Sequence, residues 1–154
     1  MAYIERPETG TGLGGDIFVD LPAENEDRKN LILHRGAVAF TMLNAFPYTN
    51  GHLLIAPYRQ ISDVVDLNDD ELLEINQLVA SGVRWIRAAY RPDGFNIGVN
   101  MGRAAGAGIP QHIHWHIVPR WNGDTNFMTT VGDVRVVPQD LHASYDRLLE
   151  ASRV

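Results

Sequence analysis

The sequence contains no cysteine, and this absence excludes both disulfide bonds and thiolate metal sites. It also has no apolar run near the ~18 residues that a membrane-spanning helix requires. The N-terminal stretch MAYIERPETG lacks the apolar core of a secretory signal. We therefore expect a cytoplasmic protein that does not associate with membranes.

Positive charge is scarce as well. The chain has 13 lysines and arginines against 19 acidic residues, a net charge of -6. Because binding to a nucleic-acid polymer is driven by neutralisation of phosphates, an acidic chain is poorly suited to it. A small anionic ligand can still bind where hydrogen-bond donors or cations are concentrated locally.

The length of 154 residues, with 45% hydrophobic residues, predicts one domain with a core of ordinary size. This domain spans residues 1–154, and its glycine-rich residues 1–15 are expected to be a flexible lead-in. The charged segment 22–30 is expected to be a solvated turn.

Apolar patterning predicts an antiparallel sheet combined with helices. Asn68, followed by Glu71, predicts a capping box that opens one long helix over 69–90, in which Gly82 marks a close packing contact. Pro138 is expected to open a short C-terminal helix through about residue 151. Short turns between strands favour antiparallel pairing, so the fold class is α+β. The strands are expected at 31–35, 37–44, 52–58, 94–102, 111–120 and 133–137.

The most informative stretch is QHIHWHIVPR, residues 111–120, in which histidines alternate with apolar residues. A strand directs successive side chains to opposite faces. The three imidazoles are therefore expected to share one face, while the apolar residues between them belong to the core. The histidines are His112, His114 and His116.

Three interpretations of this row remain open from the residues alone. An ordinary half-exposed strand is disfavoured, because polar alternation normally uses threonine, lysine or glutamate. A metal site is strained, because the outer histidines of one strand lie ~13 Å apart. The row also lacks a neighbouring acid before Asp124. Nucleophilic catalysis fits best, because the adjoining Gly106 and Gly108 let backbone N–H groups approach a phosphate closely.

The motif HIHWHIV, residues 112–118, resembles the alternating triad of the histidine-triad family. The segments 43–57, 96–111 and 118–128 resemble the branch that contains dinucleoside polyphosphate hydrolases and diadenosine tetraphosphate phosphorylases. The resemblance implies an α+β antiparallel sheet with a long helix, a homodimer, and a small nucleotide as the ligand.

The resemblance also implies a role for individual residues. His114 would attack the α-phosphorus to give a covalent nucleotidyl-histidine, His116 would assist departure of the bridging oxygen, and His112 would support the array. His52 would connect to the triad. The implied substrate-binding residues are Asn44 for the ribose and Asn100 for the phosphates. Beside them, Gly106 and Gly108 are expected at the phosphates from their backbone freedom, and Trp121 is a candidate for stacking on the base, with a core or interface aromatic as the alternative.

One departure from the family pattern concerns zinc. Many relatives carry a Cys-x-x-Cys pair before the first strand, but here Asp16 and Val19 occupy those positions. We therefore expect no structural zinc and no required cofactor, although Mg²⁺ can accompany the substrate polyphosphate.

The reaction itself stays open at this point. Water as acceptor would make the protein a hydrolase, whereas inorganic phosphate would make it a phosphorylase that releases ADP. A nucleotide-binding signalling module with little turnover and a metal-dependent hydrolase are the alternatives from other classes.

Overall fold

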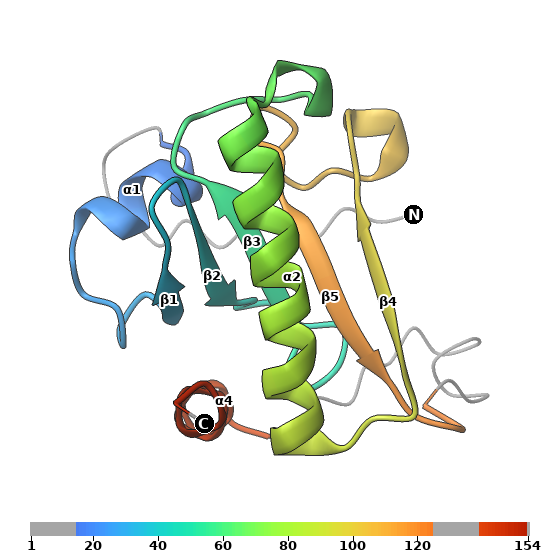
Figure 1. Ribbon diagram of the computed structural model, residues 1–154. Coiled ribbons are helices and arrows are strands. Elements are labelled where there is room, and N and C mark those ends of the chain that lie inside the picture. The colour runs from blue at the N-terminus through green and yellow to red at the C-terminus, as the bar shows by residue number, and fades with distance from the viewer. Residues whose placement is uncertain (1–14, 125–138, 154) are drawn as a thin grey trace.

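The computed structural model describes residues 15–124 and 139–153 and shows a five-stranded antiparallel sheet with helices packed on it (Figure 1). The strands follow the order β1-β2-β3-β5-β4, and every neighbouring pair is antiparallel. The α+β prediction is therefore confirmed. The elements are α1 (Ile17–Ala23), β1 (Ile32–Arg35), β2 (Ala39–Leu43), β3 (Leu53–Pro57), η1 (Val64–Asp66), α2 (Asp69–Tyr90), β4 (Gly94–Val99), η2 (Arg103–Ala105), β5 (Trp115–Arg120) and α4 (Leu141–Ala151).

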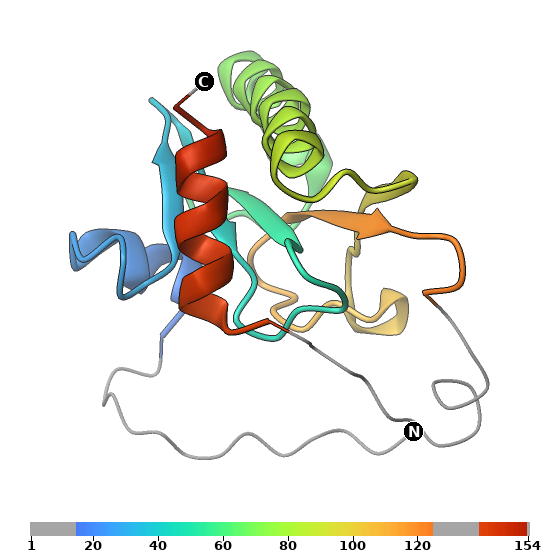
Figure 2. The same cartoon turned by 90° about the horizontal axis from the view of Figure 1, so that it is seen from below.

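The two faces of the sheet are covered by different helices. Helix α2 packs on β2, β3 and β5, and α4 packs on α2 and β1. Seen from below, the loop that contains η2 lies on the side of the sheet away from α2 (Figure 2). The smaller cluster on that second side joins Phe18 of α1 to Ile32, Phe40, Met42, Leu54 and Ala56.

Helix α2 begins and ends where its local signals indicate. The Asn68 side chain accepts from the Glu71 N–H at 2.9 Å, and the Glu71 carboxylate accepts from the Asn68 N–H at 3.0 Å, so the capping box is confirmed. The helix ends at Tyr90 and is capped by Arg91, whose φ of 50° is left-handed.

The expected close contact at Gly82 is also confirmed. A Cβ at this position would lie 2.7 Å from Ile117 Cδ1 and 3.3 Å from Leu53 Cδ1. The helix therefore rests directly on the centre of the sheet, with Ile117 of β5 beneath it.

Several elements differ from expectation. Strand β4 ends at Val99 instead of residue 102, and the solvated turn expected at 22–30 is wrong at both ends, because Pro22 is buried in α1 and Asn30 is buried too. Strand β5 begins at Trp115 instead of residue 111, and helix α1, which caps its first turn with Asp16, was not predicted. Helix α4 begins at Leu141 after the N-cap Asp140, not at Pro138. Pro138, the strand expected at 133–137 and nearly all of the lead-in lie outside the described residues. Among the helices that the structure describes, none is long and apolar enough to cross a bilayer.

Candidate active site

The histidine row enters the sheet at its centre. His116 of β5 pairs with Leu54 of β3 on one side and with Gly98 of β4 on the other. His112 and His114 lie in the segment that leads into β5. The Phe18 ring lies 5.2 Å from the ring of His112 and 4.7 Å from that of His114. Alternation therefore holds although the strand is short, and the histidine side chains lie on the α1 side.

A chain of hydrogen bonds defines the tautomers of two histidines. The Tyr48 N–H donates to His52 Nδ1 at 3.1 Å, so the hydrogen of the His52 ring lies on Nε2. This Nε2–H donates to His116 Nδ1 at 2.9 Å. The remaining hydrogen of His116 is therefore on Nε2. Asn44 Nδ2 lies 3.3 Å from the same His52 Nδ1 and supports this arrangement.

His114 has the complementary tautomer. Its Nδ1 lies 2.8 Å from the carbonyl oxygen of His112, and a carbonyl can only accept, so Nδ1 carries the hydrogen. The Nε2 of His114 is left with a free lone pair. The rings of His114 and His116 are 5.0 Å apart. A nucleophilic nitrogen and a donating N–H therefore come from neighbouring rings.

Burial keeps these rings neutral near pH 7. It is the main cause that lowers the pKa of His52 to about 3, and the neighbouring His116 and His114 lower it further. The pKa of His116 falls to about 4 because of burial and then the nearby His114. Burial also lowers the pKa of His114, against the opposing effect of its hydrogen bond to the His112 carbonyl. A neutral His114 is the form that can attack an electrophile.

His112 does not take part in that chain but is held by Asp16. The ring is fully buried, with Nδ1 at 2.6 Å from Asp16 Oδ2 and Nε2 at 2.8 Å from the Pro57 carbonyl. Sequence reasoning missed this contact. The aspartate before the apolar Ile17-Phe18 could have indicated a helix N-cap, but no local signal indicates its partner.

These residues do not fit a structural zinc ion. Tetrahedral zinc requires four ligands, usually thiolates and imidazoles. Within residues 15–124 and 139–153, no three histidine or acidic side chains converge as a ligand set. Both Asp16 oxygens already accept hydrogen bonds, from Phe18 N–H and from the Gln60 amide. The expected absence of zinc and of any required cofactor stays a prediction.

An apolar pocket of about 250 Å³ lies between α1 and the strands β2 and β3, and none of the histidines of the row is among its lining residues. It includes Leu54, the residue that pairs with His116 across the sheet. Asn44 supplies a polar group on its wall, and Phe46, 81% exposed, also lines it. The pocket can hold a flat apolar ring with a hydrogen-bonding attachment. Its lining residues are Ile17, Leu21, Lys29, Asn30, Leu31, Met42, Asn44, Ala45, Phe46 and Leu54.

The glycine-rich loop comes just before the histidine row in the chain, and its Gly106 N–H donates to the Arg103 carbonyl at 3.0 Å. Gly102 and Gly106 have φ of 77° and 85°, which favour glycine. Gly106 and Gly108 are exposed, and a Cβ added to either would meet no atom within 4 Å, so a ligand can approach their backbone. Asn100 directly follows Val99, the last residue of β4, which pairs with Trp115, the residue after His114.

Trp121 is not brought to the histidines within one chain. It follows Arg120 at the far end of β5, so roughly 20 Å of extended chain separates it from His114 at ~3.3 Å per residue. Its N–H donates to the Asp124 carboxylate at 3.1 Å. Base stacking by Trp121 stays a prediction.

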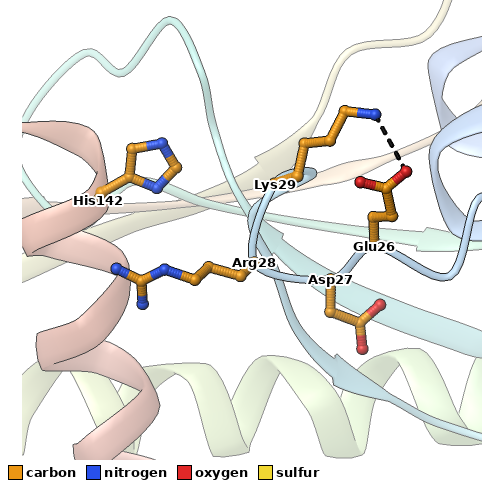
Figure 3. A pocket seen from close by; sticks show the side chains of 5 residues that line it. All are labelled: Glu26, Asp27, Arg28, Lys29 and His142. Atoms are coloured by element: carbon orange, nitrogen blue, oxygen red, sulfur yellow. Dashed lines mark hydrogen bonds and ion pairs between the residues drawn. The ribbon is translucent and has the colours of Figure 1, made fainter.

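A second hollow, of about 560 Å³, is lined by charged side chains and by His142 (Figure 3), and it shares Lys29 with the first pocket. Its charged side chains are paired: Lys29 with Glu24 and Glu26, at 3.2 and 3.3 Å, and Arg28 with Asp146. No residue of the row lines it, and we assign no chemistry to it. The lining residues are Glu26, Asp27, Arg28, Lys29 and His142.

Comparison with known proteins gives one consistent picture. Residues 24–123 match the family model of the HIT domain. The "AP-4-A phosphorylase" of Mycobacterium tuberculosis is 38% identical over 138 residues, which cover 90% of this chain and 70% of that protein. The "bis(5'-adenosyl)-triphosphatase" of Saccharomyces cerevisiae is 27% identical over 107 residues, 67% of this chain and 48% of that protein.

A solved structure shows the same fold. The zinc-bound histidine triad family protein from Mycobacterium smegmatis is 29% identical and superposes with a TM-score of 0.66. The match covers 80% of this chain and 84% of that one.

Proposed function

The chain belongs to the HIT domain family, and on that premise we propose that it cleaves dinucleoside polyphosphates at the α-phosphorus through a covalent nucleotidyl-His114. The proposed substrates are diadenosine triphosphate and diadenosine tetraphosphate. The observation that carries the proposal is the pair of tautomers. His114 Nδ1 is engaged with the His112 carbonyl and His116 Nδ1 with His52, so both Nε2 atoms remain for the substrate.

The first step forms one bond and breaks one. The lone pair of His114 Nε2 attacks the α-phosphorus, and the phosphorus–oxygen bond to the rest of the polyphosphate breaks. The bonding electrons leave with the bridging oxygen, which departs as a phosphate oxyanion. His116 Nε2–H donates a hydrogen bond to that oxygen as its negative charge develops.

The second step releases the nucleotide. The acceptor oxygen, from water or phosphate, attacks the same phosphorus, and the phosphorus–nitrogen bond to His114 breaks. The lone pair returns to Nε2 and the proton of the acceptor passes to solvent. The low pKa of His114 supports this step, because the ring leaves as a neutral imidazole.

The apolar pocket between α1 and the strands β2 and β3 supports a nucleoside as the bound group. Its apolar walls suit a base, and the Asn44 amide can hydrogen-bond a ribose hydroxyl. Asn100, Gly106 and Gly108 are proposed to contact the phosphates. The Gly106 N–H donates to the Arg103 carbonyl at 3.0 Å, so Gly108 is proposed to supply the backbone N–H and Gly106 an open approach to the loop. Mg²⁺ would arrive with the polyphosphate, held mainly by phosphate oxygens.

Inorganic phosphate is our preferred acceptor. The relative named AP-4-A phosphorylase is 38% identical over 90% of the chain, whereas the one named bis(5'-adenosyl)-triphosphatase is 27% identical over 67%. Phosphate attack on diadenosine tetraphosphate would give ADP and ATP, and water attack would give AMP and ATP.

Chromatography of the products, with and without phosphate, tests both the proposed cleavage and the identity of the acceptor. ADP that appears only with phosphate supports phosphorolysis, and AMP in both samples identifies a hydrolase. If neither appears from diadenosine tri- or tetraphosphate, the proposed function is wrong. A His114→Ala preparation made in parallel controls for contaminating enzymes.

We further propose that two copies pair through β4. This strand lies at the edge of the sheet, and its Ile97 is 48% exposed. An unpaired edge with exposed apolar residues is suited to antiparallel pairing with a second copy. Sedimentation should give the mass of a dimer, and Ile97→Lys should shift it toward the monomer. A wild-type monomer at micromolar concentration would contradict the proposed dimer but not the proposed reaction.

The cytoplasmic location expected from the sequence also stays a prediction.

A further inference from the structure

We propose that Asp16 is a positioning residue for this reaction, which holds the buried His112 ring and thereby sets the tautomer and orientation of His114. The inference rests on the proposed function, because it concerns the same nucleophile. Asp16 is 7% exposed and His112 is 0% exposed. Their side chains meet at 2.6 Å, between residues 96 positions apart in the sequence.

The His112 ring lies between two acceptors. Nε2 donates to the Pro57 carbonyl at 2.8 Å. Nδ1 faces Asp16 Oδ2, which also accepts from the Gln60 amide at 2.8 Å, while Asp16 Oδ1 accepts from Phe18 N–H at 2.9 Å. With Asp16 accepting at both oxygens, we assign the hydrogen of this contact to His112 Nδ1. The proposal therefore includes an imidazolium–carboxylate pair in the interior.

This pair reaches the nucleophile through the main chain. The carbonyl of His112 accepts from His114 Nδ1 at 2.8 Å, and this bond determines which nitrogen of His114 has the lone pair. The His112 ring is fixed from β3 by Pro57 and from α1 by Asp16, so its peptide group is fixed as well. Two residues beyond Asp16, the Phe18 ring packs 4.7 Å from the His114 ring. The first turn of α1 thus positions His114 in two ways, through the Asp16–His112 contact and through the packing of Phe18 on its ring.

Asp16→Asn is the direct kinetic test, with Asp20→Asn as the matched control. The asparagine keeps the size of Asp16 but removes its charge and replaces one acceptor with a donor. We expect kcat to fall by about 10-fold to 100-fold, as is typical for a group that orients a reacting residue, with KM within about twofold. Asp20 lies on the same helix, and no hydrogen bond joins its carboxylate to the described histidines, so its variant should retain kcat.

The effects of Asp16→Asn on kcat and on KM, taken separately, distinguish a positioning role from a structural role. Ile17 and Leu21 of α1 line the nucleoside pocket, so a displaced helix would raise KM. A raised KM with unchanged kcat, or a kcat within twofold of wild type, would overturn the proposal.

A double-mutant cycle tests whether Asp16 acts through His112. His112→Gln is expected to lower kcat, and Asp16→Asn should cause little further loss in that background. Fully additive losses would mean that Asp16 acts by another route and would overturn the proposal.

Spectroscopy of the wild-type protein tests the pair without any need for turnover. With ¹⁵N-labelled histidine at pH 7, we expect both ring nitrogens of His112 to be protonated and His114 to be the Nδ1–H tautomer. A neutral His112 ring overturns the proposal even if Asp16→Asn does not fold. Where that variant folds, it should show a mixture of His114 tautomers. An unchanged His114 spectrum would mean that Asp16 does not set the tautomer of His114, and it would overturn the proposal. If the wild type cleaves no dinucleoside polyphosphate, the proposed function fails while these spectra still decide the role of Asp16.

Discussion

The two faces of the sheet are made from alternate residues of the same strands, yet their buried groups differ in kind. Towards α2 and α4 the buried cluster is apolar and includes Ile117, Leu53 and Ile86. Towards α1 a smaller apolar cluster adjoins the buried His52, His112 and His114. Burying polar rings is unfavourable unless each is hydrogen-bonded. The large apolar face can supply that stability, which allows the other face to keep buried imidazole rings, whose nitrogens we propose to act in the reaction.

The largest expected effect comes from removing the proposed nucleophile on the histidine face. His114→Ala should lower turnover by about 1,000-fold or more, because no other group supplies the attacking lone pair. Nucleotide affinity should change by less than about threefold, as measured by calorimetry, since the pocket is intact. His34→Ala is the control, because His34 lies on β1 against Trp85 of α2. Retained turnover in His114→Ala, or its loss in His34→Ala, would contradict the division between the faces.

A smaller loss is expected for the neighbouring ring. His116→Gln removes the N–H proposed to stabilise the leaving oxygen and should lower kcat on the order of 100-fold. The defect should shrink with a nucleoside 5′-phosphoryl substrate whose leaving group is weakly basic, because less charge then needs stabilisation. Single-turnover rates with both substrates provide the comparison. An equal defect with both would show that His116 acts elsewhere in the reaction.

Changes on the α2 face should affect stability and leave chemistry alone. Gly82→Ala forces a Cβ to within 2.7 Å of Ile117 Cδ1 and 3.3 Å of Leu53 Cδ1. We expect the free energy of unfolding to fall by about 1–3 kcal/mol, partly offset by the better helix propensity of alanine. In urea denaturation Gly94→Ala, where a Cβ meets nothing within 4 Å, serves as the control. A large loss of kcat in folded Gly82→Ala would show that the faces are coupled.

The dependence of stability on pH should arise on the histidine face. The folded pKa values of about 3 for His52 and about 4 for His116 lie below the unfolded value of 6.5. As pH falls from 6.5 towards 4, the unfolded chain binds protons that the folded chain does not. The free energy of unfolding should therefore decrease on acidification, by about 1.4 kcal/mol per pH unit for each proton.

Variants on the two faces should respond differently to this titration. His116→Gln should reduce the slope of stability against pH by about one proton. Gly82→Ala should shift the whole curve downward without changing its slope. If His116→Gln has the wild-type slope between pH 6.5 and 4, the burial of His116 is not what makes the protein sensitive to acid.

Features encoded by neighbouring residues were predictable from the sequence. The Asn68–Glu71 capping box and the apolar periodicity placed α2 over its full length, because side chains three or four positions apart determine both. The alternation around His114 likewise predicted which side chains share a face. Gly82 was recognisable as a contact because glycine is unfavourable within a helix unless something requires its small size.

Features that depend on distant partners were not predictable. The β5 ladder starts at Trp115 because that residue pairs with Ile55 and Val99, and neither partner is near in sequence. Helix α1 has only seven residues and contains Pro22, so its periodicity is too short to detect. The contact of Asp16 with His112 connects residues 96 apart, and no local spacing reports it.

The covalent intermediate is the most direct test of the central claim. Turnover of diadenosine tetraphosphate would be stopped rapidly in alkali, and the protein mass and its peptide map would be measured. The account predicts one nucleotidyl group on the peptide that contains His114, formed with the first product and missing in His114→Ala. Product release with no covalent species, or a nucleotidyl group on another residue, would contradict it.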